Sequence, residues 1–348
     1  MGETLRAEGG ALKHVVREWV HFRRIRQDME SFLRSRHGFM GEVRASAFYR
    51  PASIFVEQPP LNLRLQLELA FHAVIPHRRE RKRPEEFQVK RPCNCSECSP
   101  ASVRLLPLGD ALHMHAGNIY GTAGHAHQEA YSMYQAAEEL LQHVGMSFRD
   151  VVRTWIYLRH IDRDYAEFNR ARSDFYRRSG IAVLPASTGI EGGCHASAHD
   201  FLLGLYAIQS PSPRKLAVMT TPTLNQAAAY GSDFSRGMRI EDGNKVTLFV
   251  SGTASVDEKG RTAHIGDLSG QLNRMLLNIH TLLTGQQASF EQLVLLTTYL
   301  ANQADAACVL DTLHHRGLHD LPNALVRAAV CRPDLLCEME AIAVLPLP

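Results

Sequence analysis

The 348-residue sequence predicts an α+β protein with mixed sheets and helices on one face of each sheet. The main observation is an internal repeat, since "SFRDVVRTWIYL" (147–158) and "SFEQLVLLTTYL" (289–300) share five of twelve residues. Each copy of this segment follows an amphipathic stretch that ends at a glycine, Gly145 or Gly285. Strand-like segments flank both copies, so each repeat reads strand, helix, strand, helix, strand.

The elements of the two repeats correspond in order. In the first repeat they are "ALHMHAGNIYG" (111–121), a helix with its apolar stripe from Ala130 to Val144, the strand 151–158, a helix at about Tyr165–Arg178 and a strand from Pro185. In the second repeat they are "KVTLFVSGTAS" (245–255), a helix with its stripe from Leu272 to Leu283, the strand 293–300, a helix at about Ala304–His315 and a strand from Pro322. Arg172 lies in line with Tyr165, Phe168 and Phe175 on the second helix of the first repeat.

The proline-rich segment "SPSPRK" (210–215) separates the repeats. We therefore expect an N-terminal extension at 1–100 that packs on the core, a first domain at 101–212 and a second domain at 213–348. Asp242-Gly243 predicts a hairpin turn. The segment "SAHDFLLGLYAI" predicts a strand, on which His195 and His199 would lie about 13 Å apart, too far to share a metal ion.

Composition and charge make several classes of function less favoured. A net charge of +2 does not favour binding to nucleic acid or to a membrane surface. The N-terminal residues contain no apolar segment typical of a signal peptide, and seven cysteines, an odd number, suggest reduced thiols, so we expect a cytoplasmic protein. Three thiols in "CNCSEC" (93–98) lack the fourth ligand of a structural zinc site, and the basic run 78–83 is expected to be a solvated loop.

The C-terminal segment "CRPDLLCEMEAIAVLPLP" carries the strongest candidate for catalysis. Glu338 and Glu340 share one face of a predicted strand, where burial and mutual repulsion raise the pKa of a carboxyl and favour a general acid. Alternatively, one glutamate pairs with an arginine such as Arg327 or Arg332. A turn at Arg332-Pro333 can bring Cys331 alongside Glu338, although a lone cysteine also serves as a small apolar filler.

Strand alternation places Arg153, Trp155 and Tyr157 on one face, whereas the second repeat has Leu295 at the position of Arg153. Arg153 suits either an ion pair at an interface or a fork that binds a substrate carboxylate beside Tyr157. The segment "PASTGIEGG" (185–193) contains Ser187 and Thr188 next to glycines, which allow a ligand to approach the backbone or allow a loop with positive φ.

The second repeat resembles the RidA/YjgF fold through "LFVSGTASVDEKG", "QLNRMLLNIHTLL", "SFEQLVLLTTYL" and "CEMEAIAV". The arginine of that family's "PAR" motif is replaced by Ser187 in the first repeat and Ala324 in the second. The chain is more similar to the chorismatases, which combine two RidA-like halves with an N-terminal extension. This resemblance covers about residues 100–348 and includes "RTWIYLRHIDRDYAEFNRARSDFY", "LPASTGI" and "CRPDLLCEMEAIAV".

The resemblance implies cleavage of chorismate to pyruvate and 3-hydroxybenzoate, with Glu338 protonating the enolpyruvyl ether and Cys331 assisting formation of the phenol. The expected substrate-binding residues are Arg153, Tyr157, Ser187, Thr188 and Glu340. No metal or cofactor is expected, and the protein is expected to be a monomer or a RidA-like trimer. The alternatives are a chorismatase with a dihydroxycyclohexadiene carboxylate or mixed 3- and 4-hydroxybenzoate as product, a RidA-type imine deaminase, and a non-catalytic carboxylate-binding protein.

Overall fold

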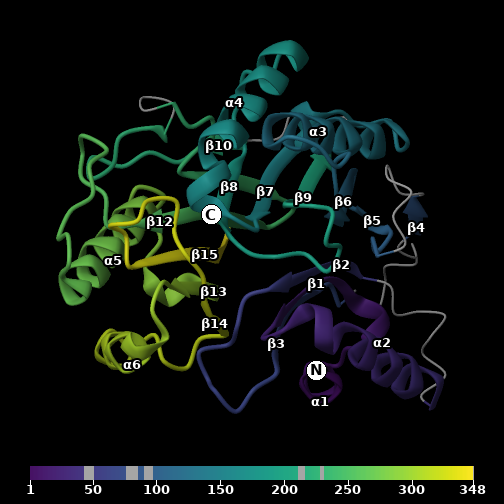
Figure 1. The fold of residues 1–348 in the computed structure, drawn as a ribbon, viewed down its shortest axis with the longest axis horizontal. Coiled ribbons are helices and arrows are strands. Elements are labelled where there is room, and N and C mark those ends of the chain that lie inside the picture. Colours follow the sequence, from purple (N-terminus) through teal and green to yellow (C-terminus); the bar gives the residue numbers. More distant parts are fainter. Residues whose placement is uncertain (43–50, 76–84, 90–96, 211–215, 228–230, 348) are drawn as a thin grey trace.

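The structure is a computed structural model that describes residues 1–42, 51–75, 85–89, 97–210, 216–227 and 231–347. Within these residues the chain forms two six-stranded mixed sheets and one three-stranded sheet, which confirms the predicted α+β class (Figure 1). Helices lie on the outer side of the sheets, and the other sheet faces turn toward one another. None of the described helices is long and apolar enough to cross a membrane.

The first repeat forms one six-stranded sheet with two helices packed on it. In sheet order its strands are β4 (Glu85–Val89), β5 (Ala101–Leu108), β6 (Ala111–Ile119), β9 (Phe201–Gln209), β7 (Val151–Leu158) and β8 (Ala186–Glu191). Its helices are α3 (Ala126–Gln142) and α4 (Ile161–Ser179). Strands β7 and β8 are parallel, and the other neighbours are antiparallel. Strand β4 therefore pairs with this sheet, although it precedes residue 101 in the chain.

The second repeat forms the other six-stranded sheet in the same way. In sheet order its strands are β10 (Leu216–Val218), β11 (Gly237–Asp242), β12 (Lys245–Ala254), β15 (Cys337–Pro346), β13 (Leu293–Leu300) and β14 (Asn323–Arg327). Its helices are α5 (Leu268–Thr284) and α6 (Ala306–His315). The predicted hairpin turn is confirmed, since Gly243 has a φ of 61° between β11 and β12.

The N-terminal segment has the topology of the second half of a repeat. Helix α1 (Gly2–Ala7) comes first, and β1 (Val15–Phe22), α2 (Ile25–Glu42), β2 (Ala52–Glu57) and β3 (Leu67–Ala73) follow. Strand β1 pairs parallel with β2 and antiparallel with β3, as β7 does with β8 and β9, and as β13 does with β14 and β15. The sequence "VVREWVHF" of β1 matches four of eight residues of "VVRTWIYL" in β7. The segment is thus a partial third copy, which was not predicted from the sequence.

The three sheets meet at three contacts that close a ring. We call each contact a seam: β8 packs against β12, β14 against β3, and β2 against β6. One hydrogen bond illustrates each seam, from Gly252 N to Thr188 Oγ1 (3.0 Å), from Leu325 N to Glu68 Oε1 (3.3 Å) and from Phe55 N to Asn118 Oδ1 (3.1 Å). Each sheet therefore contacts both of the others.

We expect the protein to be a monomer of 38.9 kDa in solution. Each of the three sheets already contacts the other two within the described residues, so the ring is closed within one chain. Size-exclusion chromatography with light scattering measures the mass directly. A mass three times larger, unchanged on dilution, would contradict this prediction.

Candidate active site

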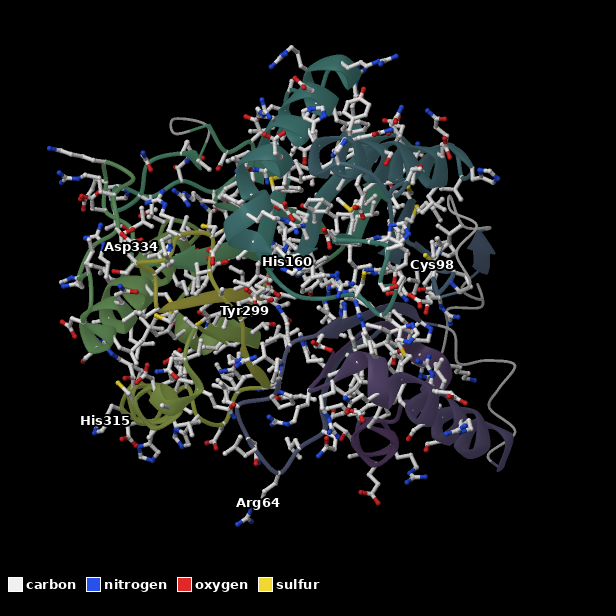
Figure 2. The ribbon with its side chains drawn as sticks, in the orientation of Figure 1. Arg64, Cys98, His160, Tyr299, His315 and Asp334 are labelled. Atoms are coloured by element: carbon white, nitrogen blue, oxygen red, sulfur yellow. The ribbon has the colours of Figure 1, made fainter. Side chains whose placement is uncertain are left out.

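A cavity of about 360 Å³ lies at the seam between β8 and β12. Three of the predicted site residues line it: Glu338 from β15, Cys331 from the turn before β15, and Ser187 from β8. Figure 2 draws the side chains of the described residues, with Tyr299 of β13 near its centre. The two repeats thus contribute opposite walls of one cavity.

Glu338 is the carboxyl group that faces this cavity. It lies opposite Ala254 on β12 and Tyr299 on β13, and its exposed fraction is 5%. Burial, and then the charge of Glu340, raise the pKa of Glu338 to about 8. Glu338 is therefore mostly protonated at neutral pH, as a general acid requires.

Gly252 leaves the space that the Glu338 carboxyl occupies. A Cβ atom at this position would overlap Glu338 Oε1 and would lie 3.0 Å from the Thr188 Cγ2 methyl. The Gly252 N–H also donates to Thr188 Oγ1 at 3.0 Å. This glycine thus allows the acid and the opposite strand to approach closely.

Glu340 has different surroundings from Glu338. Its Oε2 accepts hydrogen bonds from Arg153 Nη2 at 2.7 Å and from Thr188 Oγ1 at 2.5 Å, and its Oε1 accepts one from Trp155 Nε1 at 3.0 Å. Thr188 Oγ1 itself accepts from Arg153 Nη2 and from Gly252 N, so its own proton is directed at Glu340. Three donors, one of them a guanidinium, suit a carboxylate.

The structure places Arg153 and Tyr157, which the sequence suggested as substrate contacts, outside the wall of this cavity. Arg153 is 1% exposed and pairs with Glu340. This is the interface ion pair that the sequence offered as the alternative to a substrate-binding fork. Tyr157 is also 1% exposed, and neither residue lines the cavity. The reason is that their face of β7 points into the centre of the ring. Thr188 and Glu340 are likewise absent from the cavity wall.

Three other arginines line the cavity: Arg172 from α4, Arg236 before β11, and Arg332 before β15. Arg172 and Arg236 are 2% and 4% exposed. The ring of Phe234 lies 5.6 Å from the Arg172 guanidinium carbon and 5.5 Å from that of Arg236, which is cation–π distance. The sequence contained a signal for Arg172, because a cation on an apolar helix stripe has to face a polar partner or a ligand.

Cys331 lies near Glu338, as the predicted turn allows. Burial, and then the charge of Glu338, raise the pKa of the Cys331 thiol to about 12. A side-chain hydrogen bond to Tyr165, another residue of the cavity wall, partly offsets this rise. Cys331 is therefore a neutral thiol at the pH where Glu338 is an acid.

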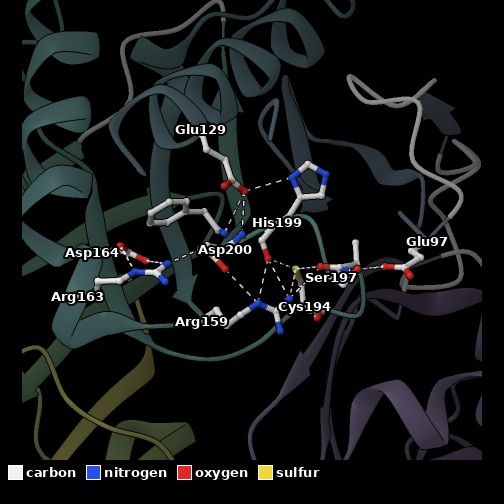
Figure 3. A network of polar contacts seen from close by, with 11 residues as sticks. Glu97, Glu129, Arg159, Arg163, Asp164, Cys194, Ser197, His199 and Asp200 are labelled. Carbon is white, nitrogen blue, oxygen red and sulfur yellow. Dashed lines mark hydrogen bonds and ion pairs between the residues drawn. The ribbon is translucent and has the colours of Figure 1, made fainter. Parts of the chain in front are cut away.

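The histidines of "HASAH" are not on a strand, since β9 begins only at Phe201. Figure 3 shows the network that holds this loop: His199 contacts Glu129 at 3.2 Å, and Arg159 donates to the carbonyl oxygens of Cys194, Ala196 and His199. The chain turns here because Arg159 and Glu129 bind its backbone, the latter by accepting from Asp200 N at 2.9 Å. No group of three or more metal-binding side chains occurs among the described residues, whereas Cys93, Cys95 and the run 78–83 lie outside them.

Comparison with known proteins agrees with this architecture. A family model described as Endoribonuclease L-PSP matches residues 225–345. A 3-hydroxybenzoate synthase from Streptomyces hygroscopicus is 27% identical over 262 residues, which cover 65% of this chain and 72% of the relative. A chorismatase crystal structure superposes with a TM-score of 0.68 at 18% identity, over 95% of this chain and 93% of the other.

Proposed function

We propose that this chain, a member of the chorismatase family, cleaves chorismate to pyruvate and 3-hydroxybenzoate. The observation that carries the proposal is Glu338, a protonated carboxyl in the wall of a cavity between two RidA-like repeats. The similarity to a 3-hydroxybenzoate synthase favours this product over the alternatives. The free thiols in the described part of the chain suit the cytoplasm, where we expect the reaction to occur.

The proposed reaction begins with proton transfer to carbon. Glu338 protonates the methylene carbon of the enolpyruvyl ether, which leaves an oxocarbenium ion and a Glu338 carboxylate. The neighbouring ring hydroxyl displaces pyruvate, and its proton returns to Glu338. The resulting arene oxide opens to the phenol, and the Cys331 thiol assists this step by donating a hydrogen bond to the epoxide oxygen. Proton and atom counts balance, and Glu338 ends protonated.

Chorismate is a dianion, so its binding requires cations in the cavity. We assign this role to Arg172, Arg236 and Arg332 rather than to Arg153. Each charge-assisted hydrogen bond to a carboxylate contributes about 1.5–3 kcal/mol. Ser187 is the remaining predicted contact in the wall, and its hydroxyl accepts a hydrogen bond from Thr154 at 2.9 Å.

Incubation of the purified protein with chorismate tests the proposal, with pyruvate measured enzymatically and the ring product identified by chromatography and NMR. We expect equal amounts of pyruvate and 3-hydroxybenzoate. Absence of pyruvate would contradict the chorismatase activity, whereas pyruvate with a dihydroxycyclohexadiene carboxylate would contradict only the product assignment. A parallel assay with enamines from amino-acid oxidation examines the imine deaminase alternative.

Replacing Cys331 with alanine is expected to shift the product toward the dihydroxycyclohexadiene carboxylate while pyruvate release continues. The reason is that the thiol acts after the ether bond is cleaved. The product ratio by chromatography is the measurement. Cys308→Ala is the matched control, since Cys308 does not line this cavity. An unchanged ratio in Cys331→Ala would make Cys331 a packing residue only.

A further inference from the structure

Glu340 is a buried carboxylate next to the cavity that the proposed reaction does not consume. It lies two residues from Glu338 on the same face of β15, and its bonds to Arg153, Thr188 and Trp155 all come from the first repeat. A charged group in this position acts on Glu338 through the low-dielectric interior.

The hydrogen bonds fix the orientation of each partner of Glu340. Thr188 has both acceptor positions filled by N–H groups, so its hydroxyl proton has one direction left. Trp155 is held by cations, with the guanidinium carbon of Arg17 4.0 Å and that of Arg153 4.8 Å from its ring. Arg17 belongs to β1, so the partial third copy also supports this arrangement.

We propose that Glu340 is a positioning residue for the reaction: Thr188, Arg153 and Trp155 hold it as a carboxylate, and its charge keeps the proton on Glu338. This inference deepens the proposed function, because it assumes that Glu338 is the acid. It also resolves the ambiguity between the two glutamates, since Glu338 faces the cavity and Glu340 faces the donors.

Other charged and titratable groups near Glu338 act on the same proton. Arg236 and Arg153 favour the ionised form of Glu338, whereas burial and Glu340 oppose it. Tyr165 and Arg172 on α4, and Cys331 and Arg332 before β15, line the cavity together with Glu338, and Tyr299 lies opposite it on β13. Because Arg153 and Arg236 stay in place, removal of the Glu340 charge should lower the pKa of Glu338.

The test is Glu340→Gln, which keeps the shape of the side chain and removes its charge. The pKa of Glu338 is expected to fall by about one unit or more, so the alkaline limb of kcat/KM moves to lower pH by the same amount. The KM for chorismate at pH 6 should change less than about threefold, because Glu340 does not bind substrate. Glu258→Gln is the matched control, as its side chain is 56% exposed, pairs with Arg274 and does not line the cavity.

A second measurement does not depend on turnover. Infrared difference spectroscopy of the free protein, corrected with Glu338→Gln, titrates the Glu338 carboxyl directly. If the wild-type protein releases no pyruvate but this titration shifts in Glu340→Gln, the proposed function fails, whereas the effect of Glu340 on the proton of Glu338 stands. A folded Glu340→Gln protein with an unchanged Glu338 titration would overturn the inference. A raised KM with an unchanged pH profile would also overturn it. Thr188→Ser should keep the wild-type pH profile and Thr188→Val should not, since only serine keeps the hydroxyl proton.

Discussion

Glu338→Gln is expected to lower kcat for chorismate by about a thousandfold or more, because glutamine cannot transfer a proton to carbon. Substrate binding should persist, since the arginines of the cavity wall are unchanged. In the wild-type protein, activity should fall as the pH rises through about 8, where Glu338 loses its proton. Steady-state kinetics across pH 5–9 and calorimetric titration of the variant with chorismate measure both effects.

The stability of the same variant provides a control. The folded-state pKa of Glu338 is raised from 4.5 to about 8, so between these values the native state holds a proton that the unfolded chain has lost. Wild-type stability should therefore fall as the pH rises through this window, by up to about 1.4 kcal/mol per pH unit from this group. Glu338→Gln lacks this contribution, so its melting temperature relative to wild type should increase from pH 5 to pH 8. Near-normal turnover by a folded Glu338→Gln protein would mean that another group is the acid.

Gly252→Ala is expected to lower kcat by about a hundredfold, because its methyl group occupies the space of the Glu338 carboxyl. The carboxyl has to move, and the hydrogen bond from Gly252 N to Thr188 is disturbed as well. Kinetics and thermal melting should show a large loss of activity with a smaller loss of stability. Gly38→Ala is the matched control, as a Cβ there meets nothing within 4 Å. Wild-type kcat in Gly252→Ala would show that the Glu338 position is not restricted.

Much of the fold could be predicted because each repeat shows apolar periodicity and glycines that mark its helices and strands locally. The matched segments 147–158 and 289–300 became β7 and β13 with the short helical turns before them, and the two long helical stripes became α3 and α5. These predictions depend on periodicity and on glycine stops, which act over a few residues. The strand expected over 197–208 begins only at Phe201, because the side chains of Arg159 and Glu129 bind the backbone of the residues before it.

The structure brings some of the predicted site residues together and separates others. Glu338 and Cys331 share the cavity because a short turn connects them, which sequence distance can indicate. Arg153 can bind a carboxylate, but in the structure it pairs with Glu340 of the other repeat. This pairing depends on how the two sheets pack, which the local sequence does not indicate. The third copy was missed because its match in β1 is eight residues long and its first half is absent.

The ring of three seams also has a consequence for symmetry. In a homotrimer one sequence builds every seam, so a change at one is made at all three. Tyr299, His21 and Tyr157 occupy equivalent positions in the three copies. Their cross-strand partners differ: they are Glu338, Glu68 and Leu202, respectively. Glu68 binds the backbone of β14, and Ile54 fills the space beside Gly204, the counterpart of Glu340. Because one chain contains all three copies, the three seams can carry different residues. One seam can then hold the reacting groups, while the other two stabilise the fold.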